Sequence, residues 1–262
     1  MISQTISQQL LDHYNISGFH ANVKQGGQKT VFFPVRDGKK QVLKLFQNGY
    51  NDRLDRELEI YDKFKHLDSI PQIISVENFN GCCFIFEEFI EGDTLCDIEN
   101  RFIGQSPLIT QLLKDIFEVM TPIWEQKLVH RDIKPENIII RENGKPVIID
   151  FGIARDLDGA TLTGTGFQPM SWRFASPEQY AGDKFKISYR TDFFSLGTLA
   201  YYLYHGQLPF GNSHNEISTK FQNNDESFTY NSAFTLHEFC REAMKFSVSE
   251  RPRAINDLIK LL

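Results

Sequence analysis

The feature that most constrains this 262-residue chain is an ordered run of eight residues and a triplet that follows it at a fixed distance. Residues 130–137 read HRDIKPEN, and residues 150–152 read DFG. Between them, two β-rich stretches flank an Asn-Gly turn, which predicts a β-hairpin. Asp132, Asn137 and Asp150 are therefore expected to lie together at the mouth of this hairpin.

These side chains indicate the chemistry of the predicted site. Carboxylate and amide oxygens are hard ligands that suit Mg²⁺, and a lysine two residues after Asp132 suits a phosphate. By itself, an Asp or Asn near a hairpin is more often a turn residue than a ligand. The complete ordered set favours a site for a divalent cation and a phosphate.

The composition narrows the class of protein and its partners. With 41% hydrophobic and 24% charged residues, the chain can bury the core of one large domain or two small ones. A net charge of −6 gives no general attraction to nucleic acid or an anionic membrane, so neither partner is expected. Four cysteines without CxxC spacing, and no leader-like or long apolar segment, predict a cytoplasmic protein with reduced thiols. The oligomeric state stays open.

The first ninety residues and the remainder differ in pattern. β-rich runs and turns alternate over about 19–46, and two further strand candidates lie at 72–79 and 82–90. Residues 51–66 place apolar side chains at helical spacing. We therefore expect a five-stranded antiparallel sheet that carries one helix.

The rest of the chain is expected to be mainly helical, which makes the fold α+β. Ser106-Pro107 is a typical cap and first-turn pair for a long helix. Its predicted buried stripe consists of Leu108, Leu112, Ile116, Val119 and Ile123. Residues 151–178 show no sustained period, which predicts a long functional loop.

The two motifs resemble the catalytic loop and the metal-binding motif of eukaryotic-type Ser/Thr protein kinases, and the resemblance extends from about residue 19 to 262. It implies a protein-kinase-like bilobal fold with ATP between the lobes. The implied division is an N-terminal extension 1–18 and a kinase domain 19–262, with an N-lobe 19–88, a hinge region 89–97 and a C-lobe 98–262.

The resemblance also implies the reaction and its residues. A protein kinase of this type transfers the γ-phosphoryl group of ATP to Ser/Thr hydroxyls of protein substrates, and the resemblance implies that the chain also phosphorylates itself. The implied cofactors are ATP and Mg²⁺, with Mn²⁺ as an alternative metal. Asp132 would orient the acceptor and take its proton, Lys134 would contact the γ-phosphate, and Asn137 and Asp150 would hold the metal. The implied ATP-binding residues are Lys44, Glu57, Gly26, Gly27, Val31, Val42, Glu88 and Ile90.

Lys44 and Glu57 match the family's phosphate-binding strand lysine and its partner on the helix. Taken singly, a lysine on a strand and a glutamate on a helix face are more often solvated surface residues. Their order ahead of the hinge and the catalytic loop favours an ion pair between them.

Several implied roles are structural. The residues concerned are His130, Phe151, Glu178, Asp192 and Arg251. Residues 176–178, SPE, resemble the family's closing Ala-Pro-Glu, with Glu178 pairing with Arg251. Asp192 resembles the carboxylate that holds the catalytic-loop backbone, although a helix cap is an equal alternative. The closing segment argues against a small-molecule kinase.

The resemblance further implies a regulatory switch. Arg131 would bind a phosphorylated residue of the long loop. The candidates are Thr161, Thr163 and Thr165, and Thr165 lies nearest the usual position.

The chain departs from the family pattern in its first part. The phosphate loop keeps only the central glycine, matched by Gly26 or by Gly26 and Gly27 together, with Lys24 and Lys29 at the outer glycine positions. Either lysine could supply charge at the phosphates or face solvent. Val42 replaces the usual alanine, and Glu87 falls behind the adenine position unless the alignment slips by one residue. Because the glycine loop is incomplete, an alternative hypothesis is a pseudokinase, that is, a nucleotide-binding or scaffolding module that does not transfer phosphate. The complete set of catalytic residues favours the active enzyme.

Overall fold

The computed structural model describes residues 8–25, 29–46, 52–151 and 171–262. The chain divides into two compact units, Met1–Glu91 and Gly92–Leu262. The division lies inside the segment 89–97 that the sequence predicts as the join. In the described part of the chain, no helix combines the length and the apolar character that crossing a bilayer requires.

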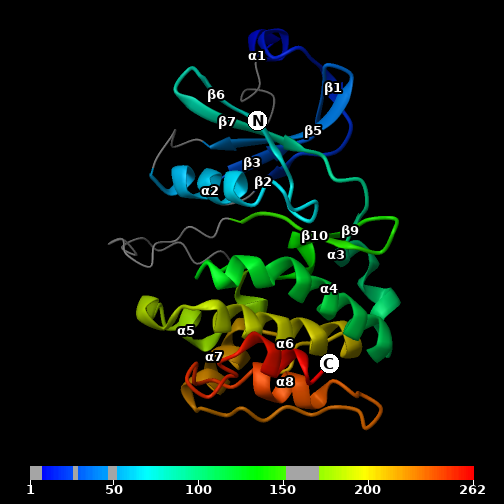
Figure 1. The fold of residues 1–262 in the computed structure, drawn as a ribbon, viewed down its shortest axis with the longest axis vertical. Coiled ribbons are helices and arrows are strands. Elements are labelled where there is room, and N and C mark those ends of the chain that lie inside the picture. The colour runs from blue at the N-terminus through cyan, green and yellow to red at the C-terminus, as the bar shows by residue number, and fades with distance from the viewer. Residues whose placement is uncertain (1–7, 26–28, 47–51, 152–170) are drawn as a thin grey trace. The chain divides into compact units, whose positions relative to one another are not determined.

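An antiparallel sheet dominates the first unit (Figure 1). Its strands are β1 (Ile16–Phe19), β2 (Lys24–Gln25), β3 (Lys29–Phe32), β4 (Pro34–Arg36), β5 (Lys39–Phe46), β6 (Ile73–Phe79) and β7 (Cys82–Glu88). Strand β5 pairs with β3, β4 and β7, and β6 pairs with β7. The antiparallel prediction is confirmed. The described residues form seven strands where five were expected, because the run TVFFPV is divided at Phe33 and because residues 16–19 add an outer strand.

The first unit includes a segment that the sequence prediction left outside the domain. Helix α1 (Gln8–His13) and β1 belong to it, and β1 pairs with β4. Leu10 and Tyr14 are buried in one core cluster with Leu43 and Phe86. The described part of residues 1–18 thus buries apolar surface in the core of the lobe.

Helix α2 (Asp52–Lys63) confirms the amphipathic prediction. Ile60 and Tyr61 are buried, and Leu58 packs against Cys83 and Ile85 of β7. The side chains of residues 52–57 lie outside the described ones. The helix thus covers the face of the sheet that carries β7's Cys83 and Ile85.

The second unit is mainly helical. Its elements are β8 (Asp93–Thr94), α3 (Leu95–Ile98), α4 (Ser106–Glu125), β9 (Ile138–Ile140), β10 (Pro146–Ile148), α5 (Pro177–Tyr180), α6 (Tyr189–His205), α7 (His214–Gln222), α8 (His237–Ala243) and α9 (Ile255–Ile259), with 3₁₀ turns at Glu99–Phe102, Pro135–Asn137, Ser171–Phe174 and Lys184–Lys186. Strands β9 and β10 form the predicted hairpin, and β8 pairs with β9.

Helix α6 is the centre of the second unit, between α4 and α8 (Figure 1). Every side chain from Thr191 to Tyr204 is buried. A Cβ at Gly197 would lie 2.7 Å from Met244 Cγ, so the absent side chain lets α8 approach closely.

Helix α4 differs from the prediction at its start. Its cap is Gln105, and Ser106 is already helical. Leu108 is 50% exposed, whereas the other four residues of the predicted stripe are buried. Its neighbour Ile109 is fully buried, so in the first turn of α4 the buried face passes through Ile109 and Leu108 points away from it.

Candidate active site

The turn that begins β9 brings the candidate catalytic residues together. Asp132 Oδ2 accepts hydrogen bonds from Lys134 Nζ at 2.7 Å and from Asn137 Nδ2 at 2.9 Å. Asn137 Nδ2 also donates to the Asp132 carbonyl at 2.8 Å. The Asp132 side chain keeps 33% of its surface exposed, whereas Lys134 keeps 12%. The site therefore holds an oriented, solvent-accessible carboxylate beside a largely enclosed cation.

The hairpin links this turn to Asp150. Ile149 N–H donates to the Asn137 carbonyl at 3.0 Å, so the segment preceding Asp150 lies against Asn137. Asp150 has φ +64° and Arg131 has φ +66°, in the left-handed region that residues other than glycine rarely adopt. Backbone strain of this kind is typical of functional sites.

The donor atoms fit a divalent cation of the Mg²⁺ type. Asn137 directs its amide nitrogen to Asp132, which leaves its amide oxygen as the atom suited to a metal. Asp150 supplies a carboxylate from the neighbouring segment. Protein sites for Mg²⁺ often provide only one or two such oxygens, because phosphate and water complete the octahedron. Among the described residues, no cluster of three or more His, Cys, Asp or Glu could hold a metal alone.

Asp192 anchors the backbone of the catalytic segment. Its Oδ2 accepts from the His130 N–H at 2.7 Å and from Trp124 Nε1 at 2.9 Å, while Oδ1 accepts from the Arg131 N–H at 2.7 Å. Burial raises the pKa of Asp192, and the hydrogen bonds from these three N–H donors act in the opposite direction. Ser188 caps α6, so the alternative of Asp192 as its cap is wrong.

Replacing Asp192 with Asn should loosen the catalytic segment. The amide keeps one acceptor oxygen but turns an N–H₂ group toward donors, so at least one of the three bonds is lost. We expect the amide hydrogens of His130 and Arg131 to exchange faster with solvent than in the unmodified protein. Hydrogen exchange read by mass spectrometry or NMR would measure this, with Asp97→Asn on the surface as the control; unchanged exchange would contradict the anchoring role.

His130 and Phe151 pack beside this anchor. The Asp132 N–H donates to His130 Nδ1 at 3.3 Å, and His130 Nε2 lies 3.2 Å from the Ile149 carbonyl. This pair of contacts assigns the proton to Nε2. The imidazole ring lies 4.9 Å from the Phe151 ring. His130 thus joins the catalytic segment to the strand that leads to Asp150.

Glu178 and Arg251 form the predicted pair. Arg251 donates to both carboxylate oxygens of Glu178 at 2.7 and 2.8 Å, and the two side chains are 0% and 2% exposed. Thr191 Oγ1 adds a bond to Glu178 at 2.9 Å, and backbone carbonyls accept the remaining Arg251 donors. This buried network fixes α5 to α6 and to the segment before α9.

Sequence reasoning missed Gln179. Its Nε2 donates to the Arg131 carbonyl at 2.7 Å, and its Oε1 accepts from the Ser176 N–H at 3.0 Å. Ser176 and Gln179 form a capping box, and the S-x-x-Q spacing is the signal that could have identified this helix start. Gln179 ties the segment after the long loop to the catalytic segment.

The first unit arranges several predicted nucleotide contacts on one sheet face. Val31 lies opposite Lys44 on β3 and β5, and Val42 lies opposite Glu87 on β5 and β7. Opposed residues share a face, and so do residues two apart on one strand. Lys44 Nζ lies 2.6 Å from Glu87 Oε1.

The structure describes only some of the other residues that were predicted to bind ATP or to regulate the enzyme. Ile90 is buried, and the carboxylate of Glu88 accepts the Gln72 N–H at 3.2 Å. Lys24 is exposed, with its ammonium 5.9 Å from the Phe33 ring. The predicted site residues that lie outside the described ones are Gly26, Gly27, Thr161, Thr163, Thr165 and the side chain of Glu57.

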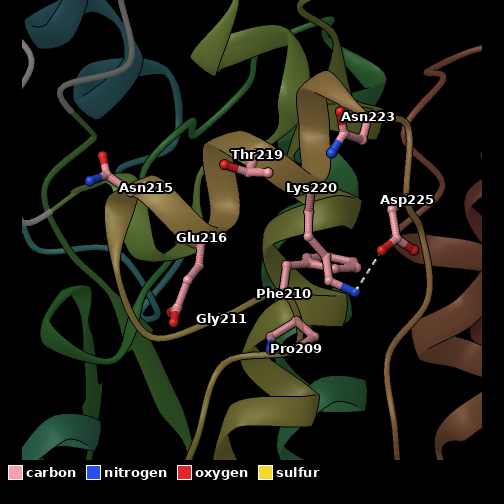
Figure 2. Close-up of a pocket in the computed structure, with 9 residues that line it drawn as sticks. All are labelled: Pro209, Phe210, Gly211, Asn215, Glu216, Thr219, Lys220, Asn223 and Asp225. Atoms are coloured by element: carbon pink, nitrogen blue, oxygen red, sulfur yellow. Dashed lines mark ion pairs between the residues drawn. The ribbon is translucent and has the colours of Figure 1, made fainter.

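A pocket lies beside α7 in the second unit, and the charged side chains that line it are bonded to neighbouring groups of the protein (Figure 2). Glu216 Oε2 accepts the N–H groups of Asn212 and Ser213 at 2.8 and 3.0 Å. Lys220 pairs with Asp225 at 3.1 Å. These groups serve a helix cap and a turn, so we assign the pocket no ligand.

Comparison with known proteins agrees with this geometry. Residues 25–261 match the profile of the protein kinase domain. The chain belongs to the protein kinase family. This match confirms the family and the α+β fold that the motifs predict.

The curated relatives are bacterial serine/threonine-protein kinases. The chain is 36% identical to PknA of Corynebacterium glutamicum, over 72% of this chain and 42% of that protein. It is 31% identical to PknA of a Nostoc species, over 64% and 30%, and 30% identical to a probable PknB of Lactococcus lactis, over 74% and 31%. The match thus spans less than half the length of each of these relatives. The prediction of a kinase of the serine/threonine type is confirmed at the level of the family.

Proposed function

We propose that this kinase domain transfers the γ-phosphoryl group of ATP to Ser/Thr hydroxyls of protein substrates, with Mg²⁺ as the metal. The observation that carries the proposal is the cluster of Asp132, Lys134 and Asn137, in which one partly exposed carboxylate is oriented by two donors. The relatives, which are named serine/threonine-protein kinases, support the choice of acceptor.

The chain's own residues supply alignment and charge. Asp132 accepts the hydroxyl proton of the substrate while Lys134, 2.7 Å away, offers positive charge to the transferred group. Asn137 and Asp150 hold the metal, which when bound neutralises charge on the phosphates. Asp192 keeps the backbone of this segment in place. Catalysis then depends on positioning and electrostatics, without covalent chemistry by the protein.

Autophosphorylation and a reducing cytoplasmic location belong to the same proposal. The location is proposed from the sequence, in which the four cysteines show no CxxC spacing and therefore favour reduced thiols. Thr161, Thr163 and Thr165 are the proposed acceptors, and Arg131 is the proposed ligand of the resulting phosphate.

Mass spectrometry of the purified chain incubated with ATP and Mg²⁺, with and without a general protein substrate, tests the proposal. We expect phosphoserine or phosphothreonine on the substrate and on the 161–165 segment, and none in a sample without ATP. Peptide mapping identifies the acceptors. Absence of transfer with both Mg²⁺ and Mn²⁺, alongside measurable ATP binding, would overturn the proposal in favour of a pseudokinase.

A further inference from the structure

A buried ion pair joins two neighbouring strands of the first unit. Lys44 Nζ on β5 lies 2.6 Å from Glu87 Oε1 on β7, and the two side chains are only 6% and 4% exposed. Lys44 lies opposite Ile85, two residues from Glu87, so the pair runs diagonally across the two strands on one face. A lysine side chain is long enough to span such a diagonal.

Apolar and aromatic groups surround this pair. The Lys44 ammonium lies 5.7 Å from the centre of the Tyr61 ring on α2, and Tyr61 is buried. Cys83 and Ile85 on the same face pack against Leu58. In such surroundings two opposite charges attract each other far more strongly than at the surface. Removing one of them therefore leaves the other charge buried with less compensation for its lost hydration, which is energetically costly.

The sheet fixes where Glu87 stands. Strands β5 and β7 pair over six consecutive positions, from Gln41 opposite Glu88 to Phe46 opposite Cys83. The carboxylate is therefore held by the same sheet that carries Lys44. An ammonium has three N–H donors, so Lys44 can bind more than one acceptor at a time, and a phosphate can be one of them.

We infer that Glu87 is the positioning residue for Lys44 in phosphoryl transfer. Its carboxylate orients the phosphate-binding ammonium from within the sheet, so the position of Lys44 is maintained by β7 whatever the position of α2. This inference rests on the proposed function for the role of Lys44. Glu87 touches Lys44 and acts through it.

Glu87→Gln separates this role from a general structural one. The amide has nearly the same shape as the carboxylate but carries no charge. The Lys44 ammonium therefore loses the ionic contact that orients it, and a negative charge near the phosphates is removed. We expect kcat to fall about tenfold to a hundredfold, as for other misplaced groups, with no increase in the KM for ATP. The control is Asp62→Asn, which removes the same charge from an exposed pair with Lys65 and should leave both constants unchanged. An unchanged kcat, or an increased KM with unchanged kcat, would overturn the inference.

A second measurement needs no catalysis. Acetic anhydride reacts with neutral amines, and removing a carboxylate that contacts a buried ammonium shifts the lysine toward its neutral form. Lys44 should therefore be acetylated several times faster in Glu87→Gln than in the unmodified chain, with Lys65 as the internal reference. Equal rates at Lys44 would overturn the inference. If the unmodified chain transfers no phosphate but the rates differ, the proposed function fails and the hold of Glu87 on Lys44 stands.

Glu87→Met covers the case in which the Gln variant does not fold. Its side chain fills a similar volume and buries no unpaired amide group, so it avoids one of the two penalties of the Gln variant; the loss of the carboxylate beside Lys44 is common to both variants. The same two readouts apply to it. A folded Met variant with the kcat and the Lys44 acetylation rate of the unmodified chain would refute the positioning role.

Discussion

Replacing Asp132 with Asn is expected to reduce phosphoryl transfer by about 10²- to 10⁴-fold, the range that a positioned general base contributes. Asn retains an oxygen that can accept from Lys134 and Asn137, so the local geometry survives. It cannot take the proton of the acceptor hydroxyl. ATP binding should change little, because the proposed metal ligands Asn137 and Asp150 remain. Single-turnover transfer to a protein substrate and equilibrium binding of ATP measure the two effects separately.

Asp257→Asn is the matched control for this prediction. It makes the same chemical change at an exposed position of α9, where Asp257 pairs with Lys260 at 3.2 Å. Transfer by this variant should equal that of the unmodified chain. A transfer rate of Asp132→Asn close to that of the control would remove Asp132 from its assigned role, whereas parallel losses of transfer and ATP binding would indicate a misfolded site.

The catalytic segment could be predicted because its geometry is local. Asp132, Lys134 and Asn137 lie within six residues, and a single 3₁₀ turn at Pro135–Asn137 brings their side chains together. The hairpin that brings Asp150 near them is likewise signalled by its turn and β-rich strands. The residues of such a motif are close in the sequence, so local backbone structure brings their side chains together and their spacing along the chain predicts the arrangement.

Contacts between distant segments could not be predicted in the same way. The hold of Glu87 on Lys44 depends on the β5–β7 register, and a shift of one residue would turn Glu87 to the other face. The family resemblance directed attention to Glu57 as the partner of Lys44 instead. Sequence reasoning noted Glu87 as an unusual residue without assigning it a partner.

The sequence pattern also failed to predict which apolar side chains near the ends of helices are buried. Leu10 and Tyr14 stand in a short polar-rich segment with no sustained period, yet both are in the core. Leu108 matches the helical period of α4 and is nevertheless exposed. Periodicity identifies a face of a helix, but whether another element covers that face is decided by tertiary packing.

Arg251→Met is expected to lower the free energy of unfolding of the second unit by about 3–5 kcal/mol, the usual result of removing one partner of a buried pair. The substitution leaves Glu178, 2% exposed, without its two strongest donors, since only Thr191 Oγ1 still donates to it among the bonds described above. Backbone carbonyls of Lys245 and Arg190 lose a donor as well. Urea unfolding followed by tryptophan fluorescence measures the change, because Trp124 is buried in this unit.

The double variant Arg251→Met with Glu178→Gln decides whether charge is the cause. If the penalty of the single variant comes from an uncompensated carboxylate, neutralising Glu178 should recover part of the lost stability, so the double variant should be more stable than Arg251→Met alone. If the penalty comes from lost packing and lost carbonyl bonds, the second substitution should add to the first. Lys260→Met, which removes a cation from the exposed pair with Asp257, should change stability by less than about 1 kcal/mol. A loss in Arg251→Met no larger than in Lys260→Met would contradict a structural role for the Glu178–Arg251 pair, since burial is what distinguishes the two sites.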